Sequence, residues 1–429
     1  DTSRLIDICI AERESIADVL IGYGWRHLEQ IVNQDKLIAF SLNSPEDELF
    51  RTVVDFGLAQ QSLAEDSKTS GNDAEPLALP ISFRFSETVP KICAATISLM
   101  DKTFAMARQL GGALPVRDHR VLPKDRPPST PDGADGADGS FVVSAACAAQ
   151  VANLCLDRLN ASMDQIVRGE SATAEILCQY TVNLSFLGQV RAPLEEHAQL
   201  LAQISPSDMA AAKTKWWDFE DTCAKFATTS EVAQSLVTKS ILGKIDELMS
   251  GGSSVDWTPE ELSEEPHWFV SDTIHYLSVT FGPGSSLNLL PSAQTQLTYF
   301  SSCGRISDSI IELLCSPQVR GVNSLSIYSL SLDCKLLSEF ARNSEVPDLS
   351  TAFARLTQLV ALLSSGDLEG YLDSDSRMQK YMFVSPDDLV MVLSKYQQLE
   401  GSSRIFSTSN NQLTVLKDSD VRRTIAALK

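Results

Sequence analysis

The feature that most constrains how this chain folds is a set of long amphipathic stripes. The first runs from Ile92 to Leu110 in steps of 4, 3, 4, 3 and 4 residues, and a second of similar rhythm runs from Leu177 to Leu201. Largely apolar positions at this spacing share one face of a helix. Pro193, inside the second stripe, is a candidate kink. Such stripes bury against other helices, so the sequence predicts helix packing rather than chemistry.

The same spacing predicts an all-α fold built as a series of antiparallel helical bundles. Long alternating, β-branched patterns are scarce, and one short stretch, Ile81–Phe83, reads as extended. We expect helix over more than roughly half of the residues, above the ordinary third. Helices are predicted at residues 2–32, 88–110, 140–167, 171–204, 230–249, 267–281, 292–314, 316–342, 349–364 and 418–428.

Four further helix starts are marked by Ser or Thr, then Pro, then an acidic residue at the third position after the cap. The hydroxyl accepts from an unpaired amide, proline fits the first helical position, and the carboxylate favours the positive end of the helix. We therefore interpret these motifs as helix caps rather than phosphorylation sites. They begin at Ser44, Ser205, Thr258 and Ser385.

One segment, residues 111–139, interrupts the helical pattern. It carries five prolines and a repeated Asp-Gly-Ala triplet, so a disordered loop is expected. A calcium loop is disfavoured because the ligand order and closing glutamate of an EF-hand are missing. We expect N-terminal bundles over residues 1–205 and a C-terminal bundle over 206–429. The chain begins at Asp1 and ends just after a helical pattern, so we expect it to be part of a longer polypeptide.

The charge of the chain restricts its partners. There are 56 acidic and 35 basic residues, a net charge of −21, and such a surface repels the phosphates that dominate nucleic-acid affinity. We therefore expect no nucleic-acid partner. No uncharged apolar run approaches the roughly 18 residues that span a bilayer, so we expect a soluble segment without direct membrane insertion.

The nine cysteines indicate a reducing compartment. They are odd in number, widely spaced and mostly among apolar neighbours, as buried thiols are in a cytosolic protein. No pair has the CxxC spacing of a zinc site, and we predict no metal and no cofactor. Asn160 and Asn183 begin glycosylation sequons, but both lie inside helical stripes, so we interpret them as chance matches.

No motif for catalysis emerges. The chain has no phosphate loop, dinucleotide fingerprint, HExxH or nucleophile elbow, and its five histidines are scattered. His267 and His275 are close in sequence, but the apolar residues around them favour structural roles. Phe219 is expected in the core, whereas the pair Trp216 and Trp217 is left open between core packing and a partner anchor. The sequence predicts that the chain is not an enzyme.

Several segments resemble the Sec-fifteen subunit family of the exocyst, the complex that tethers secretory vesicles to the plasma membrane. Residues 79–93 read LPISFRFSETVPKIC and resemble that family's FP-FS-VP segment. Residues 244–248 with 255–257 are similar to its K-I-D-E-F and Y-D-W stretches, and residues 269–277 resemble its next helix. Further similar segments lie at residues 332–341, 352–359 and 380–395, in the same order as in the family.

This resemblance implies a rod of stacked helical bundles without an enzymatic centre. It also implies a cytoplasmic protein, peripheral at sites of polarised secretion, whose partners are other exocyst subunits and a GTP-loaded Rab GTPase of the vesicle. The family's C-terminal region binds the Rab, and the helix that contains Asp333 is implicated. The resemblance therefore assigns partner binding to Ser331, Leu332, Asp333 and Lys335.

Two features qualify this assignment. Related sequences tend to have Phe-Asn just before the helix aspartate, where this chain has Leu330-Ser331, and residues 111–139 look like an insertion. The alternative hypothesis is a purely structural scaffold segment without a Rab contact. Under the Rab hypothesis we expect a modest exposed apolar patch with a polar rim on residues 324–340 and 349–363.

Overall fold

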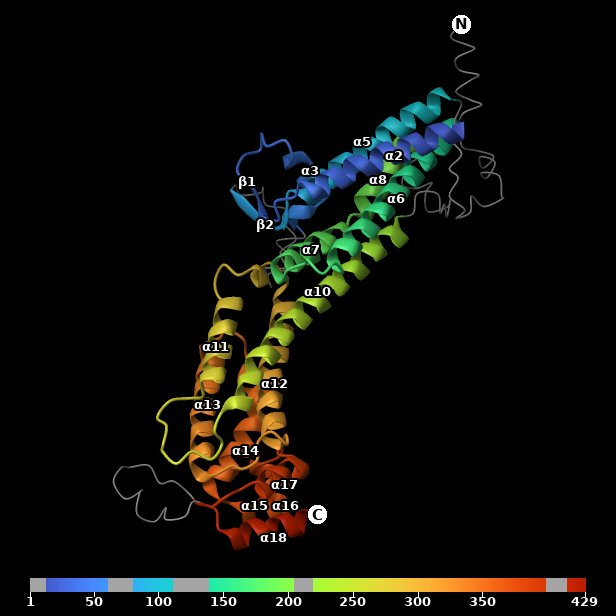
Figure 1. Ribbon diagram of the computed structural model, residues 1–429. Helices are drawn as coiled ribbons and strands as arrows, with labels where there is room; N and C mark the ends of the chain where they lie inside the picture. Colours follow the sequence, from blue (N-terminus) through green and yellow to red (C-terminus); the bar gives the residue numbers. More distant parts are fainter. Residues whose placement is uncertain (1–12, 61–79, 111–138, 204–218, 399–414) are drawn as a thin grey trace. The chain divides into compact units, whose positions relative to one another are not determined.

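The chain is predominantly helical, as the amphipathic stripes predict. The computed structural model describes residues 13–60, 80–110, 139–203, 219–398 and 415–429, and helices make up 74% of these described residues (Figure 1). The all-α prediction is confirmed. Two compact units are present, residues 1–237 and 238–429, and helix α10 (Glu220–Met249) continues from one into the other. The predicted boundary at Ser205 and nearly all of the predicted loop 111–139 lie outside the described residues and stay predictions.

The first unit is built around helix α6. This helix packs against α2, α5 and α8, and its inward face is rich in small residues such as Ala145, Ala148 and Ala152, which are fully buried. Small side chains allow close approach of neighbouring helices, while the larger residues of α5 fill the remaining space. The elements are α2 (Arg13–Asn33), β1 (Ala39–Leu42), α3 (Phe50–Asp55), β2 (Ile81–Ser86), α5 (Thr88–Gln109), α6 (Gly139–Val167), α7 (Ala174–Leu187) and α8 (Arg191–Ala202).

Helix α6 is long and apolar enough over Phe141–Val167 to cross a membrane by length and composition alone. The stretch includes Asp157 and is therefore not an uncharged run. Its most apolar window is 61% buried inside the protein, and Asp157 pairs with Lys225 of α10 at 2.5 Å. Burial against protein neighbours and a paired charge are the properties of a core helix in a bundle.

A two-stranded antiparallel sheet interrupts the helices of the first unit. The extended reading of residues 81–83 is confirmed in β2, but its partner β1 was not predicted. Phe83 and Phe85 of β2 are buried and stack on each other at 4.9 Å, and Phe85 meets Phe186 of α7 edge-on at 4.8 Å. These aromatic contacts attach the sheet to the helices.

The prediction of one helix over residues 171–204 is wrong, because the structure has two separate helices there, α7 and α8. The chain leaves α7 at Gly188, where an added Cβ would approach the backbone of Cys223 and Ala227 to 3.3 Å. This close packing against α10 favours glycine at position 188, directly after the last residue of α7. Pro193 lies in the first turn of α8, where a missing amide proton costs nothing.

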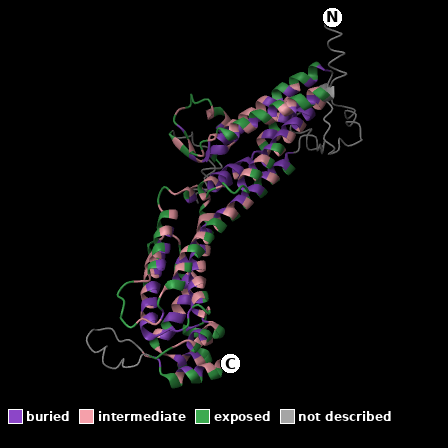
Figure 2. Ribbon diagram, in the orientation of Figure 1, coloured by how far each residue is buried: buried purple, intermediate pink, exposed green. Residues whose placement is uncertain are grey.

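The second unit is a bundle in which α11 and α13 lie side by side, and α12 and α13 both contact α14 and the 3₁₀ turn that precedes it (Figure 1). Buried residues face the interior of each unit in Figure 2, with exposed residues on the outside. The elements after α10 are α11 (Trp268–Thr280), α12 (Ser292–Cys315), α13 (Ser324–Asn343), α14 (Ala354–Ser365), α15 (Leu368–Leu372), α16 (Ser374–Lys380), α17 (Pro386–Ser394) and α18 (Asp418–Leu428), with 3₁₀ turns at Ser250–Ser254, Ser286–Leu289 and Leu349–Phe353.

The four predicted caps have different outcomes. Ser385 accepts from the Asp388 amide and caps α17, as predicted. Ser44 instead opens a turn, because its hydroxyl accepts from Glu46 N, and α3 begins only at Phe50. Thr258 does not begin a helix either, because its amide donates to Asp256 in a tight side-chain turn. Ser205 lies outside the described residues.

The predictions on cysteines and sequons agree with the structure where they can be compared. Eight cysteines are described, all as free thiols and all buried except Cys315, which is half-buried. Burial raises the pKa of the Cys155, Cys178 and Cys303 thiols to about 12, so they stay protonated. Asn160 and Asn183 are buried inside helices. Phe219 is fully buried, as expected, and the pair Trp216 and Trp217 is outside the described residues.

The Asn183 side chain joins three segments of the first unit. Its Oδ1 accepts from Ser86 N at 2.9 Å and from Gln179 at 3.1 Å, and its Nδ2 donates to Ser86 Oγ and Asp35. Because Asn183 is 1% exposed, water cannot replace these hydrogen bonds.

We predict that Asn183→Ala lowers the free energy of unfolding by about 2–4 kcal/mol, since each buried group left unpaired costs about 1–3 kcal/mol. Asn160→Ala is the matched control, because Asn160 is also a buried helical sequon asparagine but its Oδ1 accepts no hydrogen bond from the protein. Urea denaturation measures the free energy of unfolding of both variants. Equal losses in the two would contradict the role assigned to the Asn183 network.

Candidate functional site

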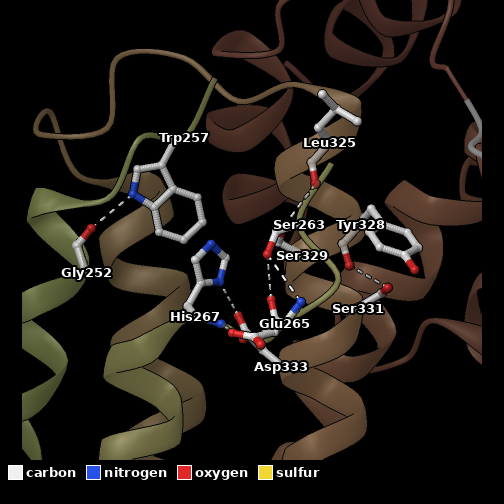
Figure 3. Close-up of polar contacts among 10 residues, drawn as sticks. All are labelled: Gly252, Trp257, Ser263, Glu265, His267, Leu325, Tyr328, Ser329, Ser331 and Asp333. Atoms are coloured by element: carbon white, nitrogen blue, oxygen red, sulfur yellow. Dashed lines mark hydrogen bonds and ion pairs between the residues drawn. The ribbon is translucent and has the colours of Figure 1, made fainter. Parts of the chain in front are cut away.

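The segment before α11 is not helical and is held by side-chain contacts. Trp257 is buried, and its indole Nε1 donates to Gly252 O at 3.0 Å. Its ring lies 5.0 Å from the ring of His267, the residue that caps α11. The imidazole ring is thereby placed between Trp257 and Asp333 of α13 (Figure 3).

Asp333 of α13 and His267 at the start of α11 are joined by two hydrogen bonds. The His267 amide donates to Asp333 Oδ1 at 2.8 Å, and His267 Nδ1 lies 2.6 Å from Asp333 Oδ2. The Asp333 side chain is 0% exposed and the His267 side chain 11%. One carboxylate therefore satisfies both an unpaired amide at the start of α11 and a ring nitrogen, in a site that water does not reach.

The start of α13 is attached to the same segment. The Asn323 side chain caps the helix by accepting from the amides of Leu325 and Ser326, and Ser326 Oγ accepts from the Asn323 amide at 3.0 Å. The remaining Asn323 Nδ2 donates to Pro259 O at 2.9 Å. The predicted start of this helix at Ser316 is therefore too early. Val322 instead pairs with Tyr396 in a short β-bridge before the cap.

These attachments fix which face of α13 points outward. Successive helical residues are rotated by ~100°, so Ser331 and Lys335 lie on the side opposite Asp333. Lys335 is exposed, whereas Ser331 and Leu332 are half-buried. The Ser331 hydroxyl donates to Tyr328 O at 2.6 Å, within the helix (Figure 3). The structure thus brings three of the four predicted site residues to one outer surface and buries the fourth, Asp333.

The expected exposed apolar patch is not found on α13 or α14. Tyr328, Leu332 and Leu336 are half-buried along α13, and no large apolar side chain of either helix is among the exposed ones in the described residues. Lys335, Glu339 and Arg342 supply the polar rim of this stripe. We name the outward residues Tyr328, Ser331, Leu332, Lys335 and Glu339 the α13 stripe.

The contacts around Asp333 are packing and hydrogen-bonding contacts. In the described residues, no three His, Cys, Asp or Glu side chains gather as metal ligands. Burial first, and the Asp333 charge second, raise the pKa of the neighbouring Cys334 thiol to about 12, so this cysteine is not a thiolate nucleophile. One small cavity in the first unit is lined by Phe56, Leu194 and Phe226, among other residues.

The sequence interpretation of Asp333 missed its pairing. The signal was present, because Asp333 lies on the apolar face of its helix with Leu330, Cys334 and Leu337, all of which are buried. An acidic residue on such a face needs a buried partner. The structural role expected for His267 is consistent with this contact, but periodicity along one helix cannot identify a partner on another.

Comparison with known proteins places the chain in a family. The family model described as "Exocyst complex subunit Sec15 C-terminal" matches residues 143–395, which include the segment before α11, α13 and α14. The human relative "Exocyst complex component 6B" is 24% identical over 262 residues, which is 59% of this chain and 31% of the relative. "Exocyst complex component SEC15A" of Arabidopsis thaliana is 21% identical over 283 residues, which is 62% of this chain and 34% of the relative.

A solved structure also aligns with this chain. "Crystal Structure of Sec15 C-terminal domain" aligns over 84% of this chain and 98% of that chain, with 18% identity and a TM-score of 0.47. The chain spans about a third of the length of the curated relatives that it matches. Because the family match extends over more than half of the residues, the chain belongs to the exocyst Sec15 subunit family, in the C-terminal region of that family.

Proposed function

We propose that this chain is the partner-binding part of a vesicle-tethering exocyst subunit, and that the α13 stripe binds a Rab-family GTPase in its GTP form. The protein would act in the cytoplasm at sites of polarised secretion, where it links the vesicle to other exocyst subunits. The observation that carries the proposal is the outward placement of Ser331, Leu332 and Lys335 on a helix whose rotation is fixed by buried contacts. Family membership supports the tethering role.

Recognition by a surface explains how such a protein selects one nucleotide state. The switch segments of a small GTPase are ordered by contacts to the γ-phosphate and are released on hydrolysis. A protein that contacts the ordered switches binds the GTP form more tightly and shifts the population toward it. The half-buried apolar residues of the α13 stripe suit this role because they lose little conformational freedom on binding.

We predict that Lys335→Glu combined with Ser331→Trp weakens binding to a GTP-locked secretory Rab by at least about tenfold, or about 1.4 kcal/mol. The first change reverses an exposed charge and the second adds bulk to the α13 stripe. Isothermal titration calorimetry with GTP-locked and GDP-locked Rab measures the effect. Lys239→Glu on α10 is the matched control, since Lys239 is also exposed on a helix of the second unit. Unchanged affinity in the double variant would move the interface to another face.

Asp333 is expected to act on stability rather than on the partner directly. Asp333→Ala leaves the His267 amide and ring without their acceptor, so we predict a loss of about 3–5 kcal/mol in the free energy of unfolding. Leu337→Ala, on the same buried face, should lose about 2–5 kcal/mol, whereas Lys335→Glu should stay within about 0.5 kcal/mol. Thermal unfolding of the three variants and the parent protein measures these differences in stability. An Asp333→Ala protein as stable as the parent would refute the role of the buried pair.

A further inference from the structure

Helix α18 lies against α15 and α17 in the second unit (Figure 1). It follows residue 395, where the match to the family model ends, so it lies outside the part of the chain that the family model describes. Val421 and Thr424 are buried, and Ile425 and Leu428 are half-buried, a spacing that forms one face of the helix. We name the surface of α15 and α17 beneath this helix the α15–α17 face. It already holds a short amphipathic helix.

Few buried contacts hold α18 in place. Of its eleven residues, Val421 and Thr424 are buried, and the Thr424 hydroxyl donates to a carbonyl of its own helix. Arg423 pairs with Glu369 of α15, but the two side chains are 54% and 77% exposed. Ion pairs that are this exposed contribute little to stability. The attachment of α18 is therefore slight compared with that of a core helix.

The helical state of α18 depends on this docking. Isolated helices shorter than about 12–15 residues are marginal in water, and α18 has eleven residues. Within the described residues, no side chain caps its first turn. Just before the helix, the Leu416 amide donates to the Tyr396 hydroxyl at 3.1 Å. Release of α18 from the α15–α17 face and loss of its helix are thus one local event, of the kind that opens at low free-energy cost.

Docking within one chain is favoured over docking between molecules. A segment of the same chain acts as if it were present at an effective concentration of about 1 mM. At this concentration α18 stays mostly docked even if its affinity as a separate peptide is only about 100 µM. A helix of another protein that binds the α15–α17 face more tightly displaces it.

We propose that α18 is a releasable strap over the α15–α17 face, and that an amphipathic helix of a partner protein occupies this face when α18 leaves. The partner helix carries apolar residues at the i, i+3, i+4 and i+7 spacing of α18 and a basic residue opposite Glu369, because α18 itself meets the face in this way. The α15–α17 face is separate from the α13 stripe, and the proposal does not rest on Rab binding.

A second copy of this chain is a poorer occupant. Its own α15–α17 face already holds its own α18, so an exchange of the two helices makes the same contacts as before. Association of the two copies nevertheless costs translational and rotational freedom. A partner protein whose helix has no such face of its own gains the full contact.

The test uses the full chain with Val421→Asp, because a carboxylate in the buried contact releases α18 from its own face. The probe is a fluorescent peptide of residues 415–429, and anisotropy measures its binding. We expect the Val421→Asp chain to bind the peptide with a Kd below about 1 mM, the limit that docking within the chain sets. The parent chain should bind it at least about tenfold more weakly, because its own α18 occupies the face. Ala426→Asp, the same change on the exposed side of α18, is the matched control and should behave as the parent.

A charge exchange locates the peptide on the α15–α17 face. In the Val421→Asp chain, Glu369→Arg should weaken peptide binding by about threefold or more, the size expected for an exposed charge pair. A peptide with Arg423→Glu should regain this affinity. A peptide with Arg422→Glu is the control and should not, since Arg422 pairs with Asp418 inside α18.

Several results overturn the proposal. They are no peptide binding to the Val421→Asp chain, equal binding to that chain and the parent, and an equal response of the two arginine peptides to Glu369→Arg. Loss of the helical circular dichroism signal in the Val421→Asp chain would show that α18 is an integral part of the core rather than a strap. A dimer that sedimentation detects in the parent and not in the Val421→Asp chain would assign the face to α18 of a second copy.

Discussion

The contact between Asp333 and His267 is the constraint on which the orientation of the candidate surface depends. A carboxylate that is 0% exposed has both oxygens occupied, one by the amide that begins α11 and the other by the imidazole of His267. Because a buried charge without these bonds is costly, α13 cannot rotate about its axis without breaking them. Asn323 holds the start of the same helix to Pro259. The result is that Ser331 and Lys335 face outward because Asp333 faces inward.

Much of the fold follows from helical periodicity. The helix predicted at residues 88–110 corresponds to α5, and the predictions for α6, α11, α12 and α18 also agree with the structure to within one or two residues at each end. The errors have local causes that single-residue patterns do not contain. Gly188 follows α7 where the backbone of α10 lies close to it, and Thr258 donates both its amide and its hydroxyl to Asp256 Oδ1 instead of capping a helix. Strand β1 depends on pairing with a segment about forty residues away, which periodicity cannot reveal.

The candidate site was predicted less completely than the fold. Resemblance to the family singled out the helix around Asp333, and helical geometry then separates its members: Lys335 is exposed, Ser331 and Leu332 are half-buried, and Asp333 is inside. Similarity to family motifs indicates which segments resemble the family, but it does not indicate which side of a helix contacts a partner.

The α13 stripe presents its side chains on a helix that buried contacts already hold in place. The central claim is that the outer side of α13 is the Rab-binding surface. Hydrogen–deuterium exchange of the full chain, alone and with a GTP-loaded secretory Rab, tests it most directly. The account predicts that exchange slows over residues 328–339 with the GTP-loaded Rab and not with the GDP-loaded form. Slower exchange confined to other helices, or the same change with both nucleotides, would contradict it.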